Sequence, residues 1–209
     1  MNVLYLTSSP RGADSYSTRV ANDLIADIRR DNPDAQIKVR DLAADPLPHI
    51  DADFIAATRG PNGPQTERQR ALLTRSDELV DELLAADTVI IATAMINFTI
   101  PTTLKAWFDW VGRPGKAFAY VDGKPKGLVT GKRAVVIGAS GGVYAGENPV
   151  GDYQRPYLKW MLGFIGITEV EFVDVGGIGY GPEAAAKSVA DATAKIHATC
   201  DRVAAEAAA

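Results

Sequence analysis

Three short runs of this 209-residue chain are apolar on both faces of an extended strand: Val3–Leu6, Thr88–Thr93 and Ala134–Ala139. A strand of this kind exposes apolar surface unless both of its faces are covered, which is typical of parallel sheets between two layers of helices. The stretches between these runs carry apolar residues at helical spacing, as in Ser17–Arg30. This alternation predicts a doubly wound α/β domain.

Two weaker strands complete the expected sheet. Ile37–Val39 is short, and Val170–Val175 alternates in part, which suits an edge strand. Thr66 and Gln69 have the spacing of a capping box at a helix start. We therefore expect one domain over residues 1–209, with a five-stranded parallel sheet and helices on both faces. Further elements are expected at Ala52–Ala57, Thr102–Val111, Tyr153–Ile165 and from Pro182 (helices) and at Phe118–Gly123 (a short strand or hairpin).

Composition and charge exclude several classes of protein. The net charge is −4, which argues against nucleic acid or an anionic membrane as the main partner. No run of about 18 apolar residues could span a membrane, and Met1–Pro10 lacks the basic segment of a signal peptide. The one cysteine, Cys200, cannot form an internal disulfide, which favours a reducing compartment. We expect a cytoplasmic enzyme without a metal site, because no ligand cluster has suitable spacing.

Ligands of open α/β sheets bind at the carboxyl ends of the strands. The first loop there, residues 8–17, contains Ser9, Ser15 and Ser17 and leads into a helix. Hydroxyls and the N–H groups of a helix start favour an anion, and Arg11 could add a positive charge. One serine would suffice as a helix cap. Three serines with an arginine favour a phosphate site over simple capping.

The familiar phosphate motifs are absent from the chain. No G-x-G-x-x-G follows the first strand, and no G-x-x-x-x-G-K-[ST] occurs. Gly177–Pro182 has proline at the third glycine position, so we interpret it as a turn before the last helix. A hydroxyl-rich loop suits the single phosphate of flavin mononucleotide better than a dinucleotide.

The second and third loops have the composition of a ring site. Residues 94–101 are apolar around one amide, Asn97, which offers a flavin ring a flat wall with a donor and an acceptor. Alternatively, Asn97 satisfies only its own backbone. In the third loop, Gly141 and Gly142 follow Ser140 and allow the backbone to approach a ring closely.

The third loop also matches the G-x-S-x-G motif of serine hydrolases. Ser140, Asp174 and His197 even occur in the chain order of a hydrolase triad. However, Val143–Gly151 contains glycines and a proline where that motif needs a helix, and His197 falls inside a predicted helix. A hydrolase is therefore the weaker alternative.

The residues of these loops resemble those of the FMN-dependent NADH-azoreductases, a family that also reduces quinones. The similarity covers nearly the whole chain and implies a flavodoxin-like fold and a homodimer. It rests on the serine loop, on Met95-Ile96-Asn97-Phe98 with Ile100-Pro101 and Leu104-Lys105-Ala106-Trp107-Phe108-Asp109, on Gly127-Leu128-Val129-Thr130-Gly131-Lys132, and on Leu162-Gly163-Phe164-Ile165-Gly166-Ile167.

The resemblance also implies roles for individual residues. The phosphate end of FMN is expected at Ser9, Ser15, Tyr16 and Ser17, and the flavin ring at Met95, Ile96, Asn97, Phe98, Ala139, Ser140, Gly141 and Gly142. Tyr120 matches a position on the substrate side of the dimer cleft, and Arg59 one at the pocket mouth. The chain departs from the family at Ala94, often proline, at Ile96, often tyrosine, at Tyr16, often glutamine, and at Ala139-Ser140, often Ser-Arg.

We therefore expect an FMN-dependent reductase that uses NADH or NADPH to reduce quinones and azo compounds. Hydride transfer through flavin N5, with one stacking position for donor and acceptor, implies ping-pong kinetics and no catalytic side chain. The alternative is a flavodoxin-type electron carrier without NAD(P)H oxidase activity. Asp45–Pro64, a long proline-rich excursion, adds a wall that a carrier does not need.

Overall fold

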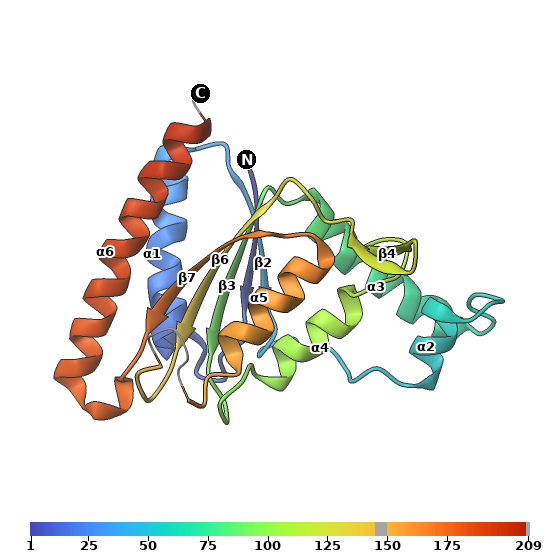
Figure 1. The fold of residues 1–209 in the computed structure, drawn as a ribbon, viewed down its shortest axis with the longest axis horizontal. Helices are drawn as coiled ribbons and strands as arrows, with labels where there is room; N and C mark the ends of the chain where they lie inside the picture. The colour runs from blue at the N-terminus through green and yellow to red at the C-terminus, as the bar shows by residue number, and fades with distance from the viewer. Residues whose placement is uncertain (145–149, 208–209) are drawn as a thin grey trace.

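The centre of the molecule is a parallel sheet with strand order β2-β1-β3-β6-β7 (Figure 1). The computed structural model describes the backbone of residues 1–144 and 150–207, and the side chains of these up to residue 198. All five predicted strands are present, including the two weaker ones. Their bounds are Asn2–Thr7 (β1), Gln36–Asp41 (β2), Thr88–Ala94 (β3), Arg133–Ala139 (β6) and Glu169–Val175 (β7).

Helices cover both faces of the sheet, as predicted. Figure 1 shows α1 (Tyr16–Asp31) and α6 (Pro182–Ala207) side by side on one face. The other face carries α3 (Glu67–Ala85), α4 (Thr102–Val111) and α5 (Gln154–Ile165). A shorter helix, α2 (Ala52–Arg59), packs on α3 away from the sheet. None of the helices in the described part of the chain is long and apolar enough to cross a bilayer.

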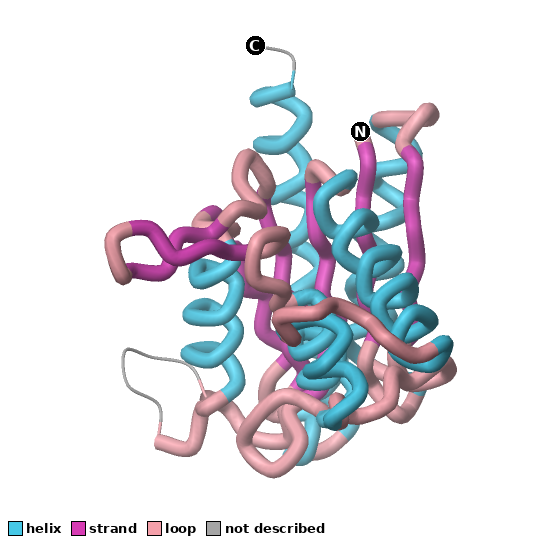
Figure 2. The backbone as a smooth tube through the Cα atoms, turned by 90° about the vertical axis from the view of Figure 1, so that its right-hand side faces the viewer, coloured by secondary structure: helices cyan, strands magenta, loops and turns pink. Residues whose placement is uncertain are grey.

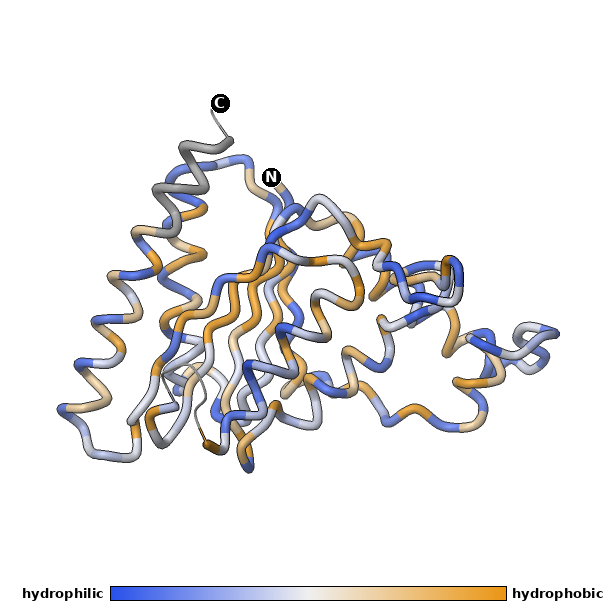
Figure 3. The backbone as a smooth tube through the Cα atoms, in the orientation of Figure 1, coloured by the Kyte–Doolittle hydropathy of each residue, from blue (hydrophilic) through white to orange (hydrophobic). Residues whose placement is uncertain are grey.

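Each central strand contributes to two separate cores because its side chains alternate between the faces. In β1, Val3 and Tyr5 pack toward α1 and α6, whereas Leu4 and Leu6 pack toward the other helices. Figure 3 shows the apolar character of these strands. Burial of one such side chain contributes about 1.5–3 kcal/mol, which explains why predominantly apolar runs form the centre of the sheet.

The strand order creates a switch point between β1 and β3. From β1 the chain adds β2 on one side, and it later adds β3, β6 and β7 on the other. All five strands run parallel, so their carboxyl ends lie on one edge of the sheet. A crevice at this edge is where open α/β sheets bind ligands.

A small antiparallel hairpin, β4 (Phe118–Val121) with β5 (Lys124–Gly127), confirms the short strand or hairpin predicted there. It projects from the body of the molecule (Figure 2). Its two-residue turn has positive φ at Asp122 (51°) and Gly123 (74°), as a type I′ turn requires. Gly127 lies so close to the end of α5 that a Cβ there would overlap the backbone of Ile165 and Gly166.

This close approach predicts opposite effects for two glycine substitutions. Gly127→Ala should lower the free energy of unfolding by about 1–3 kcal/mol, because rigid backbone must move aside. Gly163→Ala, in the exposed interior of α5 with no atom near its Cβ position, should raise it by about 1 kcal/mol. Urea denaturation measures both changes. Equal effects of the two variants would contradict this account of how the hairpin docks.

Candidate functional site

The three loops predicted to carry the chemistry lie together at the carboxyl edge of the sheet. In the first loop, the Ser8 hydroxyl donates to Thr93 Oγ1 of β3 at 3.0 Å. In the second, the Met95 N–H donates to the carbonyl of Ala139 at the end of β6, at 2.7 Å. In the third, the Ser140 N–H donates to the last carbonyl of β7, at 3.0 Å. Adjacent parallel strands thus join loops that are far apart in the sequence.

The first loop ends in an α-helix start without a side-chain cap. A 3-10 turn, Gly12–Asp14, precedes Ser15, whose hydroxyl makes no capping bond and lies 3.0 Å from Ser17 Oγ. The side chains of Ser9, Ser15 and Ser17 are all buried. The alternative interpretation, in which these serines serve as helix caps, therefore does not hold for Ser15. The first-turn N–H groups and the helix dipole remain available for an anion.

Two arginines contact the aromatic ring of Tyr16, the first residue of α1. The guanidinium groups of Arg11 and Arg19 each lie 5.6 Å from the Tyr16 ring centroid, in cation–π contact. Arg19 also pairs with Asp14 at 3.5 Å. The side chain of Tyr16 is thus held by these arginines, so its backbone N–H is the group that it offers to an anion.

The second loop contains a tight and strained turn. Ile96 and Thr99 exchange backbone hydrogen bonds of 2.9 and 3.1 Å around Asn97 and Phe98, which both have positive φ (46° and 71°). Asparagine tolerates this conformation, whereas phenylalanine in it costs on the order of 1–3 kcal/mol. Strain of this kind collects at functional sites. The exposed Asn97 amide makes no hydrogen bond with other described residues, so it does not serve its own backbone.

The third loop is held by the glycine turn before α6. The carbonyls of Ser140, Gly141 and Gly142 accept hydrogen bonds of 2.9–3.2 Å from the backbone N–H groups of residues 177–179. A trans peptide places its N–H opposite its carbonyl. The N–H groups of Gly141 and Gly142 therefore point away from that turn. A Cβ at Gly179 would lie only 3.0 Å from the Gly141 carbonyl oxygen, so this turn needs glycine there.

The interpretation of Gly177–Pro182 as a turn before a helix is confirmed, because a 3-10 turn at Ile178–Tyr180 precedes α6. Its support of the third loop was not predicted. Ala139, by contrast, is buried in the core under α1 and α6, so only its backbone faces the loops. Met95 is half-buried, and Ile96 and Phe98 are exposed beside Asn97.

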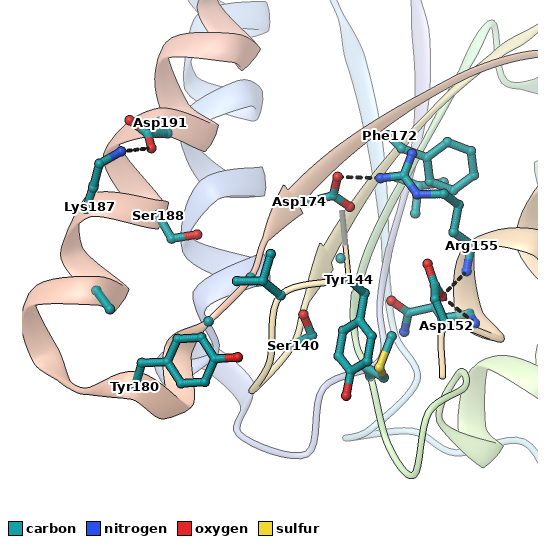
Figure 4. A pocket seen from close by; sticks show the side chains of 18 of the residues that line it. Ser140, Tyr144, Asp152, Arg155, Phe172, Asp174, Tyr180, Lys187, Ser188 and Asp191 are labelled. Carbon is teal, nitrogen blue, oxygen red and sulfur yellow. Dashed lines mark hydrogen bonds and ion pairs between the residues drawn. The ribbon is translucent and has the colours of Figure 1, made fainter. Parts of the chain in front are cut away.

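The hydrolase triad is not assembled. His197 Nδ1 lies 2.5 Å from Asp27 Oδ2, which joins α6 to α1. Asp174 pairs with Arg155 instead (Figure 4). The described residues after Ser140 form bends rather than the helix that a nucleophile elbow needs. The arrangement at Ser140 therefore lacks the partners of a nucleophile.

Tyr120 and Arg59 do not join the three loops within one chain. Tyr120 lies on the hairpin, which packs at the carboxyl end of α5, while the amino end of α5 contacts the second loop. The 12 residues of α5 span about 18 Å. Arg59 ends α2, which lies beyond α3 in Figure 1. Their roles at a substrate site remain predictions that need a second chain.

A cavity of about 370 Å³ lies beside the loops, between α5, β7 and α6 (Figure 4). Met95 and Ser140 border it; the ion pair Arg155–Asp174 joins α5 to β7 in its lining, and the pair Lys187–Asp191 lies along α6. No sequence pattern signalled this cavity, because elements that are far apart in the sequence form it together. In the described ranges, no cluster of three or more His, Cys, Asp or Glu residues could hold a metal ion.

Gln154 is a further residue that the sequence did not single out. It opens α5, is only 6% exposed, and its Nε2 donates to the carbonyl of Ala94 at the start of the second loop, at 2.9 Å. The two positions are 60 residues apart, and no local signal connects them.

Comparisons with known proteins agree with this geometry. Residues 1–200 match a family described by its flavodoxin-like fold. An FMN-dependent NADH:quinone oxidoreductase of Mesorhizobium japonicum is 47% identical over 199 residues, 95% of each chain. One from Rhizobium johnstonii is 47% identical over 197 residues, 93% of this chain and 96% of that one.

A solved structure shows the same fold. The FMN-dependent NADH-azoreductase of Bacillus anthracis str. Ames Ancestor, determined in complex with FMN, superposes with a TM-score of 0.89. It is 25% identical, and the match covers 98% of this chain and 100% of the other. The resemblance inferred from the loops is confirmed, and the chain belongs to the family of FMN-dependent NADH:quinone oxidoreductases and azoreductases with a flavodoxin-like fold.

Proposed function

We propose that this protein is an FMN-dependent reductase that uses NADH to reduce quinones and azo compounds. The observation that carries the proposal is the identity of 47% to an FMN-dependent NADH:quinone oxidoreductase over 95% of both chains. The convergence of the three loops at the switch point of the sheet supports it independently.

The first loop fits the phosphate end of FMN. Ser9, Ser15 and Ser17 offer buried hydroxyls, and Tyr16 and the following residues offer first-turn N–H groups of an uncapped helix. Together they give hydrogen-bond donors and a favourable dipole to a dianion. Arg11, above Tyr16, adds a positive charge nearby.

The second and third loops fit the flavin ring. Met95, Ile96 and Phe98 offer apolar contact around the exposed amide of Asn97. Ala139 and Ser140 bring the backbone to the ring, and the N–H groups of Gly141 and Gly142 point away from the turn behind them. These donors favour ring oxygens and developing negative charge.

FMN, held by the three loops, would supply hydride-transfer chemistry between the two substrates, and the overall reaction of NADH, a proton and a quinone gives NAD⁺ and a hydroquinone. The protein binds and orients the reactants, and the proton comes from water. No acidic or basic side chain of the three loops is assigned to the chemistry. We propose the same sequence of steps, with ping-pong kinetics, for azo acceptors.

We also propose that residues 1–209 act as one FMN-binding domain in the cytoplasm. All five long strands belong to one sheet. The one cysteine of the chain, Cys200, cannot form an internal disulfide, and this supports a reducing compartment.

We further propose a homodimer in which Tyr120 lies on the substrate side of the cleft between the subunits and Arg59 lies near the pocket mouth. Tyr120 (68% exposed) and Trp160 (65% exposed) are linked through Phe118 and Phe164 into one aromatic surface over α5 and the hairpin. Exposed aromatic side chains in a continuous surface are typical of protein interfaces. Tyr120 lies about one helix length from its own loops, so a role at the substrate requires a second copy.

Reduction of the bound flavin by NADH distinguishes a reductase from an electron carrier. NADH added without air to the FMN-loaded protein should bleach the visible flavin band, and a quinone added next should restore it. Stopped-flow absorbance measures both steps, with free FMN at the same concentration as the control. A flavin that stays oxidised in the presence of NADH would favour the carrier.

Removing a hydroxyl from the first loop should weaken FMN binding through its phosphate. Ser15→Ala removes one bond to a charged group, worth about 1.5–3 kcal/mol, so we expect FMN affinity to fall about 10- to 100-fold. Riboflavin, which lacks the phosphate, should bind the variant and the original protein equally. Fluorescence titration measures both ligands, and an equal loss for riboflavin would contradict a phosphate role. The free energy of unfolding should fall by about 1–3 kcal/mol, because Ser15 does not cap the helix but its buried hydroxyl bonds to Ser17 Oγ.

A charge in the aromatic surface should dissociate the dimer. We expect Trp160→Glu to sediment as a monomer that binds FMN but has lost quinone reductase activity. Tyr180→Glu is the matched control, because Tyr180 is 70% exposed but lies beside α6, away from this surface. Analytical ultracentrifugation gives the mass, and a monomeric original protein would refute the proposed dimer.

A further inference from the structure

Gln154 lies buried where α5 meets the second loop. The Asp152 carboxylate already caps this helix, since its Oδ1 accepts from the N–H groups of Gln154 and Arg155 at 2.9 and 3.0 Å. The side-chain amide of Gln154 is therefore not needed at the helix end. A buried amide must find hydrogen-bond partners elsewhere, and this one finds them in the second loop.

The Gln154 amide joins the two ends of that loop. Its Nε2 donates to the carbonyl of Ala94, the last residue of β3, at 2.9 Å, and approaches the carbonyl of Thr99 at 3.5 Å. Thr99 closes the tight turn that presents Asn97. The backbone N–H of Tyr153 adds a bond to the carbonyl of Phe98, at 2.9 Å. Two successive residues before and at the start of α5 thus hold both the base and the tip of the turn.

The turn needs such anchors because its backbone is strained. Asn97 and Phe98 both have left-handed φ, and phenylalanine adopts this conformation only where the surroundings impose it. If the bonds from residues 153 and 154 were lost, Phe98 could relax to negative φ. The Asn97 amide would then leave its position at the edge of the sheet.

The central sheet also leaves space for the Gln154 side chain. Gly138 lies in β6, between Thr93 and Asp174 of the neighbouring strands. A Cβ at Gly138 would lie 3.0 Å from Gln154 Oε1. Glycine is unfavourable inside a strand because it has no side chain to pack. At Gly138 this loss leaves room for the side-chain amide of Gln154.

We propose that Gln154 is a positioning residue for the flavin ring: its amide holds the second loop so that Asn97 and Phe98 meet the ring. This inference rests on the proposed function, because it concerns the same cofactor site. Gln154 itself acts through the loop and donates to backbone carbonyls rather than to the cofactor.

The decisive variant is Gln154→Glu, which keeps the shape and exchanges the donor for an acid. An ionised carboxylate would face the carbonyl oxygens of Ala94 and Thr99 and be repelled, whereas a protonated one can donate to Ala94. Burial and these carbonyls both disfavour the charged form. We expect FMN to bind this variant about 10-fold more weakly at neutral pH and to regain affinity as the pH falls.

Two more variants make the test specific. Gln154→Met, which has no donor at any pH, should bind both FMN and riboflavin about 10-fold more weakly at every pH, with a shifted visible spectrum of the bound flavin. An equal loss of affinity for FMN and riboflavin indicates that the variant affects the ring site. Ser15→Ala, by contrast, should weaken only the binding of FMN, through its phosphate. Gln69→Met, the same exchange in the first turn of α3 and remote from the loops, should leave flavin binding unchanged.

The outcomes separate this inference from the proposed function. If the original protein binds no flavin, both fall. If it binds FMN, but Gln154→Met binds equally well with the same spectrum and Gln154→Glu shows no pH dependence, the positioning role is overturned and the proposed function stands. If Gln154→Met does not fold, the pH profile of Gln154→Glu decides, because protonation restores the donor in a folded chain.

Discussion

Each candidate cofactor loop is fixed by a backbone hydrogen bond that extends the parallel sheet by one residue. The N–H groups of Ser8, Met95 and Ser140 donate to carbonyls of the neighbouring strands at 3.1, 2.7 and 3.0 Å. The first residue of each loop is therefore positioned by the sheet, whose central strands are buried on both faces. A loop is usually the mobile part of a fold, but here its first residue belongs to the ladder. The relative placement of the three loops thus follows from the register of the strands.

Three of the departures from the family pattern, at Tyr16, Ile96 and Ala139, leave the backbone groups of these loops in place. The side chain of Tyr16 contacts two arginines, so the helix start offers the same backbone N–H group with tyrosine as with glutamine. Ala139 faces the core, so its side chain does not face the loops. Ile96 is exposed and its backbone closes the turn. These departures change side chains, whereas the backbone N–H and carbonyl groups of the three residues stay the same.

The sequence predicted the elements well and the contacts between them poorly. Apolar runs located the three central strands, a short weak pattern and a partly alternating one located the other two, and Thr66 with Gln69 forms the expected capping box. The predicted helix at Ala52–Ala57 extends to Arg59 and is capped by Asp51. Such signals are local, because periodicity and capping depend on residues a few positions apart. Gln154, the cavity at Arg155 and the support of Gly141 by Gly179 depend on contacts across the fold, and no pattern in one sequence carries them.

Helix α5 connects the cofactor loops to the proposed dimer surface. Asp152 caps its first turn, and Gly166, with a φ of 114°, ends it with bonds back to Leu162 and Gly163. Both ends are therefore defined, and the length of α5 sets a distance of about 18 Å between the second loop and the hairpin. Tyr120 cannot cross this distance within its own chain. If an aromatic side chain of the hairpin contacts the acceptor, the acceptor must lie between two subunits; α5, which bonds to the second loop through Gln154, also carries the exposed Trp160.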